Sequence, residues 1–327
     1  MDLRKRCAFT LKALRKKNTG WALGCAVWCL LNSGHAQAFC RTRACDPRKE
    51  VCTRDATGCI TTGPFLHWPN ACTSFSVNQA GSPKLGISFF TADNIISEAV
   101  SKWLAVDCGS GIHPSLELKH YGPVSCGVHV YDQEGPNANV WMFADDEWRS
   151  FGDSHTLALT FVSYGAETGQ IFDADVEINS ANNVITATDV GVRLDLESIV
   201  THEAGHFLGL EHSTDPEATM WAGYSPGNTR MRDLSPDDIA AICEAYPAGR
   251  KVVDSSCEPR GGFTKQCYEE VVAPNAGCSA TAHAFRPSLP QDRNRGLIAG
   301  ALLGVVLATR YRRHRPPPKL NLELGDA

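Results

Sequence analysis

The sequence has no apolar run long enough to cross a membrane. Its two apolar segments, residues 21–31 and 296–309, contain 11 and 14 residues, whereas a membrane-spanning helix needs about 20. The chain also has no internal repeat. Hydrophobic residues make up 43% and charged residues 20% of the chain, so its composition is that of a folded globular protein rather than a disordered one.

Positive charge is scarce in the body of the chain. The formal net charge of −5 combines +6 over residues 1–38, +3 over residues 310–327 and −14 over residues 39–309. Nucleic-acid phosphates would repel an acidic body of this kind. We therefore exclude nucleic acid as a partner.

No CxxC pair occurs among the eleven cysteines that follow residue 38, out of 14 in the whole chain. A zinc site built from cysteines is therefore not predicted. A cysteine content this high is typical of exported proteins with disulfide bonds. Eleven is an odd number, so one thiol is left over; if that thiol is Cys278, ten cysteines remain for five disulfides.

The N-terminus has the features of a signal peptide. Seven Lys or Arg residues precede the apolar run at 21–31, and Ala36-Gln37-Ala38 supplies the small residues needed at a cleavage site. A short membrane anchor is the alternative, which the length of the run disfavours. We predict cleavage after Ala38 and export, with a secreted, cell-envelope or cell-surface location.

Composition and periodicity divide the chain into segments. The predicted segments are a signal peptide at 1–38, a Cys-rich leader at 39–62, a main domain at 63–248, a Cys-containing linker at 249–290 and an apolar segment with a basic tail at 291–327. We expect disulfides to hold the loops of the leader.

Helical and strand periodicities alternate within the main domain. The pattern predicts helices capped by Thr91 or Asp93, over about 194–210, and from Ser235 to about Tyr246. Strands are predicted at 116–121, 128–132, 140–144, 157–164 and 171–178. This order predicts the α+β class, with three main helices covering one face of a twisted mixed β-sheet.

One stretch carries the chemistry, and it begins at His202. The residues read His-Glu-Ala-Gly-His-Phe-Leu-Gly-Leu-Glu-His from position 202 to position 212. On a helix, His202 and His206 project from one face about one turn apart, so two ring nitrogens can reach one ion. Gly209 allows the chain to leave the helix, and His212 can return as a third ligand.

These residue types predict a catalytic zinc site. Three neutral imidazoles leave zinc its full charge and one open position for water and substrate. Glu203 lies beside the metal rather than on it, where it can act as general base and then protonate the leaving amine. A structural zinc site would close with a fourth protein ligand, and the motif contains none.

The motif resembles that of the metzincin clan of zinc peptidases. The form HExxHxxGxxHS, with Ser213 after the third histidine, narrows the resemblance to matrixins. The resemblance implies a metzincin-like catalytic domain with zinc in a cleft, and it makes Met220 the Met-turn residue, a hydrophobic floor under the metal. It also implies that Asp237 and Asp238 tie the last helix to the Met-turn; a helix-start preference for acids is the alternative.

Further correspondences concern the substrate. The resemblance implies that residues 171–180 form the edge strand that pairs with an extended peptide, that Tyr224 lines the main specificity pocket and that Ser198 sets its depth. Trp221-Ala222 departs from the family's usual Tyr-Pro. No cysteine-switch motif and no histidine set for a second zinc are present, so one zinc is predicted. The Asp145-Asp146 loop could hold Ca²⁺, but its ligand spacing does not support a site.

The C-terminal tail combines three features. Gly277-Cys278-Ser279 precedes a polar spacer, the apolar run and the arginines that follow it. This order resembles bacterial C-terminal sorting signals, which implies processing near Cys278 by a sorting enzyme. A plain membrane tether is the alternative.

The sequence as a whole predicts an exported zinc metalloendopeptidase whose partners are protein or peptide substrates. The alternative is a surface binding module that keeps the fold without catalysis. The presence of Glu203 favours the enzyme, because a degenerate peptidase is expected to lose its base before its metal ligands.

Overall fold

The structure, a computed structural model, describes residues 38–148, 154–266 and 279–287. The chain divides into two units, Met1–Ala38 and Phe39–Ala327, and all elements below belong to the second. They are, in chain order, β1 (Cys40–Arg41), β2 (Cys72–Asn78), α3 (Phe89–Ala105), β3 (Glu117–Val124), β4 (Val140–Phe143), β5 (Ala158–Tyr164), β6 (Ile171–Ile178), β7 (Ile185–Thr186), β8 (Leu194–Asp195), α4 (Leu196–Phe207), β9 (Leu210–Glu211), β10 (Gly223–Tyr224), the 3-10 helix η1 (Arg230–Arg232), α5 (Pro236–Ala245) and β11 (Ser279–Pro287).

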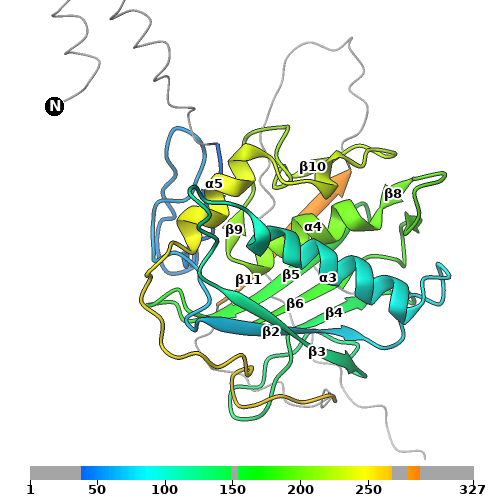
Figure 1. The fold of residues 1–327 in the computed structure, drawn as a ribbon, viewed down its shortest axis with the longest axis horizontal. Helices are drawn as coiled ribbons and strands as arrows, with labels where there is room; N and C mark the ends of the chain where they lie inside the picture. The colour runs from blue at the N-terminus through cyan, green and yellow to red at the C-terminus, as the bar shows by residue number, and fades with distance from the viewer. Residues whose placement is uncertain (1–37, 149–153, 267–278, 288–327) are drawn as a thin grey trace, which may run out of the picture. The chain divides into compact units, whose positions relative to one another are not determined.

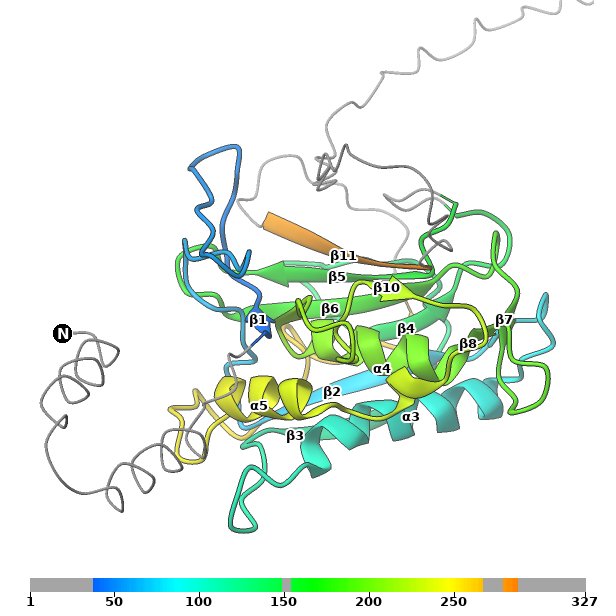
Figure 2. The same cartoon turned by 90° about the horizontal axis from the view of Figure 1, so that it is seen from above.

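Seven strands form the main sheet, in the order β10-β11-β5-β6-β4-β2-β3 (Figure 1). Neighbouring strands run parallel except at β5, which is antiparallel to both β6 and β11. The helices lie on one face of this sheet (Figure 2). The predicted α+β class with a mixed sheet and three main helices is therefore confirmed.

The core lies between the sheet and helices α3 and α4. Trp103 of α3 is fully buried, and its Nε1 donates to the carbonyl oxygen of Thr201 in α4 at 2.8 Å. Trp141 of β4 and Phe207 of α4 are also fully buried, with ring centroids 6.0 Å apart. Burial of such large rings fixes α4 against the sheet, and α4 carries the histidine motif.

The helix boundaries follow local capping. The last helix begins as predicted, because Ser235 and Asp238 form a capping box with Pro236 in the first turn. The cap of α3 was predicted wrongly: its N-cap is Ser88, whose Oγ accepts from the Thr91 nitrogen at 3.2 Å. The helix begins three or five residues earlier than a cap at Thr91 or Asp93 predicts, and it still buries the same apolar face.

Two strand predictions need correction. Residues 128–132 form no strand; the Val130 nitrogen donates to the side chain of Asp175 at 2.9 Å instead of to a neighbouring strand. The prediction missed β2, which lies inside the sheet with all seven residues buried. Its small polar residues leave only Phe75 and Val77 as a short apolar alternation, and the burial of the polar residues depends on neighbours far away in the chain.

Disulfides hold the loops of the leader together and join the linker to the domain. The leader contains the bonds Cys40–Cys59 and Cys45–Cys52. The bonds Cys72–Cys257 and Cys108–Cys243 join distant parts of the chain, and Cys126 is disulfide-bonded as well. Every cysteine among the described residues is therefore oxidised.

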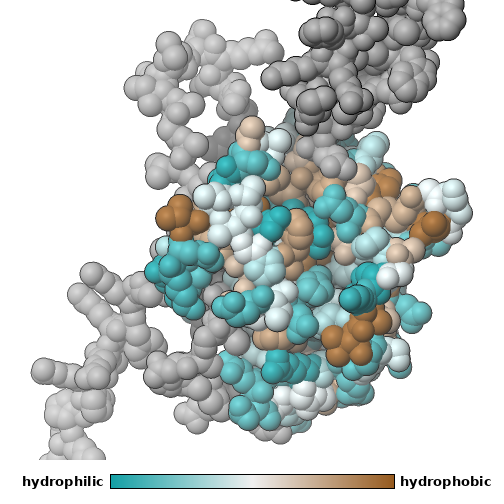
Figure 3. All heavy atoms as spheres, turned by 90° about the vertical axis from the view of Figure 1, so that its left-hand side faces the viewer, coloured by the Kyte–Doolittle hydropathy of each residue, from teal (hydrophilic) through white to brown (hydrophobic). Residues whose placement is uncertain are grey.

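The face shown in Figure 3 is mostly hydrophilic, with apolar side chains in scattered spots. Most large exposed apolar side chains over the described residues are isolated positions such as Val51 and Val190, and Val252 and Val253 form an adjacent pair. Scattered exposure of this kind is normal for a protein surface. Within the same residues, no helix has the length and apolarity that crossing a membrane requires.

Candidate metal centre

Helix α4 presents His202 and His206, and nearly all of its residues are buried. Asp195 caps its N-terminus by accepting from the Ser198 nitrogen at 2.9 Å. The helix ends after Phe207, and Gly209 adopts a φ of +86°. A Cβ at Gly209 would lie 2.7 Å from the Leu66 carbonyl oxygen. The position therefore requires glycine for both conformation and space, and the chain can turn back towards the helix there.

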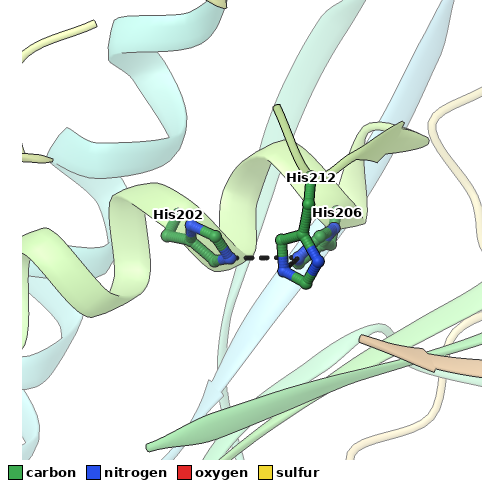
Figure 4. Close-up of side chains that lie close together, drawn as sticks. All are labelled: His202, His206 and His212. Atoms are coloured by element: carbon green, nitrogen blue, oxygen red, sulfur yellow. Dashed lines mark hydrogen bonds between the residues drawn. The ribbon is translucent and has the colours of Figure 1, made fainter. Parts of the chain in front are cut away.

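The three histidines converge on one point (Figure 4). Nε2 of His206 lies 3.1 Å from Nε2 of His202 and 3.2 Å from Nε2 of His212. Ligand atoms 2.0–2.1 Å from a tetrahedral zinc would be about 3.4 Å apart. Among the described residues, these three form the single group of metal-ligating side chains close enough to share an ion.

Hydrogen bonds define the tautomers of the first two rings. Nδ1 of His202 lies 2.6 Å from the Thr219 carbonyl oxygen, and Nδ1 of His206 lies 2.9 Å from that of Leu210. A carbonyl oxygen only accepts, so each Nδ1 carries the proton and each Nε2 presents a lone pair. Lone pairs this close repel one another, and a cation between them removes the repulsion. The donor set therefore fits zinc, which favours imidazole nitrogen.

Glu203 lies beside this cluster and is fully buried. Its Oε2 accepts a hydrogen bond from Thr160 Oγ1 of β5 at 2.6 Å. Its Oε1 is buried without a hydrogen-bond partner. Burial raises the pKa of Glu203 to about 8, and the Thr160 hydroxyl opposes the shift. An unpartnered carboxylate oxygen in the interior is costly, which indicates that this site holds a further group, such as water beside a metal.

Met220 lies directly under the histidine helix. A Cβ placed on Gly205 would be 2.2 Å from Met220 Sδ, so glycine between the two ligands makes room for the methionine. The segment is held by Asp238, which accepts from the nitrogens of Thr219 and Met220 at 2.7 and 3.0 Å. The tie between the last helix and the Met-turn segment is therefore present in the structure. Through the Thr219 carbonyl it reaches the ring of His202.

The two predicted pocket residues both contact the cap of α4. Tyr224 is buried, and its hydroxyl accepts from the Asp195 nitrogen at 2.9 Å and donates to the Asn228 carbonyl oxygen. Ser198 is fully buried, and its Oγ donates to the Asp195 carboxylate at 2.7 Å. Their roles in a specificity pocket stay predictions. Cys278 lies outside the described residues.

The prediction that residues 171–180 form an edge strand is wrong. Residues 171–178 form β6, which lies inside the sheet between β5 and β4. The strand that neighbours the histidine helix on the outer side is β5, and Thr160 on β5 contacts Glu203. The resemblance misassigned the strand because two successive apolar runs both match a strand next to the site, and pairing order is not a local property.

Two contacts of the site escaped the sequence analysis. The sequence predicts Thr160 only as part of the strand at 157–164 and Asp195 only as part of the helix over about 194–210. The capping position of Asp195 three residues before Ser198 was a usable signal. For Thr160 there was none, because its hydroxyl meets Glu203 only through the packing of β5 on α4.

Comparison with known proteins finds a family that is similar to the part of the chain around this site. Residues 138–247 match the sequence profile of the Matrixin family, Peptidase_M10. This part of the chain is matrixin-like. The matrixin-like region contains β4, β5, β6, α4, Met220 and α5, whereas β2 and α3, which complete the sheet and core, lie outside the match.

Individual relatives match between about a quarter and about half of the chain. Human matrilysin is 48% identical over 156 residues, which is 48% of this chain and 51% of that protein. Metalloendoproteinase 1 of Glycine max is 44% identical over 75 residues, 23% of this chain and 24% of that protein. A probable matrix metalloproteinase, 095L, of Invertebrate iridescent virus 3 is 35% identical over 104 residues, 32% of this chain and 26% of the viral protein. The chain thus spans between about a quarter and half of the length of these relatives.

Proposed function

We propose that this chain is a zinc metalloendopeptidase that hydrolyses peptide bonds in extracellular proteins. His202, His206 and His212 would hold the zinc, and Glu203 would be the general base. One observation carries the proposal: the Nε2 atoms of the three histidines converge beside a buried carboxylate that has an unpartnered oxygen. Chance packing would not bring three imidazole nitrogens to one point next to a buried, unpartnered carboxylate oxygen.

The chain's own residues divide the work. Zinc, when bound, supplies a Lewis acid that acidifies water and polarises the scissile carbonyl. Thr160 holds Oε2 of Glu203, so Oε1 remains to take the proton from the attacking water and deliver it to the leaving amine. The carbonyls of Thr219 and Leu210 keep the protons of His202 and His206 on Nδ1, which leaves both Nε2 atoms available as ligands.

The further parts of the proposal follow the sequence. Residues 1–38 would direct export, Met220 would be the floor of the metal site, and Tyr224 and Ser198 would line or limit the pocket. The tail from residue 291, with Cys278 before it, would tether the protein or be processed by a sorting enzyme. One zinc is proposed; Asp145 already accepts from Ser82 Oγ at 2.6 Å and from Ser180 Oγ, and we propose no calcium there.

The test combines zinc content with peptidase activity. The purified protein should contain one zinc per chain by elemental analysis and should cleave an unstructured protein in a chelator-sensitive manner. Glu203→Gln should keep the zinc and lose activity by about 10²–10⁴-fold, whereas His212→Ala should lose zinc and activity together. Full activity in Glu203→Gln would overturn the mechanism. One zinc without cleavage in the parent protein would favour the alternative, a binding module with the same fold.

A further inference from the structure

Strand β11 comes from the C-terminal part of the chain and joins the sheet beside the histidine helix. It pairs antiparallel with β5 along seven positions, from Ser279 opposite Tyr164 to Phe285 opposite Ala158. It then pairs parallel with β10, with Arg286 opposite Gly223 and Pro287 opposite Tyr224. The strand order places β11 between these two strands, and Figure 2 shows it on the outer side of β5. The segment was predicted to be linker, so this pairing is a finding of the structure.

β11 pairs with two strands that carry residues in contact with the metal site. His283 is the partner of Thr160, the residue whose hydroxyl binds Glu203. At its other end β11 meets β10, where the Tyr224 hydroxyl accepts from the nitrogen of Asp195, the cap of α4. The strand also contacts α4 itself. β11 therefore lies next to α4, and it runs from β5, which contacts Glu203, to β10, which contacts the cap of α4.

The position between β5 and β10 is suited to bind an extended peptide. A peptide that adds to an open sheet edge binds through main-chain hydrogen bonds, which carry no demand on its sequence. Here the free sides of β5 and β10 would offer those bonds on two sides of one strand. A peptidase that cleaves extended chains needs this arrangement close to its base and its metal.

We propose that residues 279–287 occupy the place of the peptide substrate, so that the chain's own C-terminal segment competes with substrate for the site. This inference rests on the proposed function. The strand is joined to Gln266 by residues 267–278, a tether of twelve residues. A short tether gives an effective concentration of about 1 mM, so a segment with a dissociation constant of about 0.1 mM would raise the apparent KM about tenfold.

Cleavage of the tether would end the inhibition. Cys278, the predicted processing position, directly precedes the strand in the sequence. A cut there would turn the strand from a tethered competitor into a free peptide, which dilution removes. Processing of the C-terminus would therefore activate the peptidase as well as release it.

The experiment uses the full chain with zinc and breaks the strand without touching the metal site. In the variant Ala282→Pro/His283→Pro, two successive residues lose their N–H groups, and successive N–H groups in a strand point to opposite sides, so one bond towards β5 is lost. The matched control, Ala282→Thr/His283→Thr, keeps both donors and favours strand conformation. The kinetics of a quenched fluorescent peptide are measured for all three proteins.

The proline variant should show a KM about tenfold lower than the parent, with kcat unchanged, and the threonine control should match the parent. A synthetic peptide of residues 279–287 should restore the higher apparent KM in the proline variant by competition. Equal KM in the parent and the proline variant would overturn the inference while leaving the peptidase assignment intact.

A second readout separates this inference from the proposed function. If none of the proteins cleaves peptide, binding of the fluorescein-labelled 279–287 peptide is measured by anisotropy. Tighter binding to the proline variant than to the parent would support the inference although catalysis has failed. Equal binding by both proteins, or no binding to either, would overturn it.

Discussion

The backbone nitrogen of Phe39 donates a hydrogen bond to Oδ1 of Asp237 at 3.1 Å, and Oδ2 of Asp237 accepts from Ser213 Oγ at 2.6 Å. Phe39 is the residue that follows the predicted cleavage site, and Ser213 follows the third histidine. One carboxylate thus joins the start of the leader to the loop that carries His212. The strand β1, which pairs with β9, extends the same contact.

Cleavage after Ala38 should strengthen this contact, because it would convert the Phe39 amide into an ammonium group. A charge-assisted hydrogen bond is stronger than a neutral one, so a protein that begins at Phe39 should be more stable than one that begins at Ala38 by about 1 kcal/mol. Thermal unfolding of the two proteins measures the difference. In the Asp237→Asn background the difference should vanish; a difference of the same size there would contradict the pairing.

Gly205→Ala should destabilise the protein, although alanine favours a helix by about 1 kcal/mol over glycine. The new Cβ would lie 2.2 Å from Met220 Sδ and 3.0 Å from Trp103 Cζ2, and overpacking of this kind costs about 1–3 kcal/mol. Displaced Met220 should also weaken zinc binding, because the neighbouring Thr219 carbonyl holds His202. Urea unfolding and zinc titration measure both effects. In a Met220→Ala background the cost should largely disappear, and an undiminished cost would contradict the contact.

Two acids of β6 should make the protein less stable at alkaline pH. Burial raises the pKa of Asp173 well above its usual value, with the charge of Asp175 adding to the shift. Burial also raises the pKa of Asp175 to about 7, against the opposing N–H groups of Val140 and Val130. The folded protein therefore holds these protons more tightly than the unfolded chain. Their stabilising contribution is complete below about pH 4 and is lost as the pH rises through 7.

Asp173→Asn removes one of the two titrating carboxyl groups. Oδ1 of Asp173 is buried without a hydrogen-bond partner. The variant should melt a few degrees higher than the parent at pH 8, about 2–4 °C per kcal/mol, and close to the parent at pH 5. Asp175→Asn is the control: it gives up one acceptor of the Val140 and Val130 nitrogens and should melt lower at both pH values. An equal change for Asp173→Asn at pH 5 and pH 8 would rule out the titration.

Disulfides that close long and short stretches of chain should differ in their effect on stability. Cys72–Cys257 closes a separation of 185 residues, which Cys108–Cys243 already shortens in part, whereas Cys45–Cys52 closes only 7. Loop entropy predicts that replacing Cys72 and Cys257 with alanine lowers the free energy of unfolding by about 4 kcal/mol. Replacing Cys45 and Cys52 should lower it by about 2 kcal/mol. Denaturant unfolding of the two variants tests the order. A larger loss for the Cys45–Cys52 pair would show that strain or local packing outweighs chain entropy.

The sequence by itself determined what depends on near neighbours in the chain. These features are local, and each is read from a few adjacent residues: the spacing of His202 and His206, the glycine at 209 and the cap of α5. The resemblance to matrixins likewise rests on one continuous motif and the Met-turn that follows it.

Tertiary structure decided what depends on pairing between distant segments. The buried strand β2, the inner position of β6 and the addition of β11 to β5 follow from the order of strands in the sheet, which no local pattern encodes. The contact of Thr160 with Glu203 exists because β5 packs on α4, and it engages Oε2 of the carboxylate while Oε1 has no hydrogen-bond partner. Such pairings are set by the burial that the whole fold achieves, so they become visible only when the distant segments are brought together.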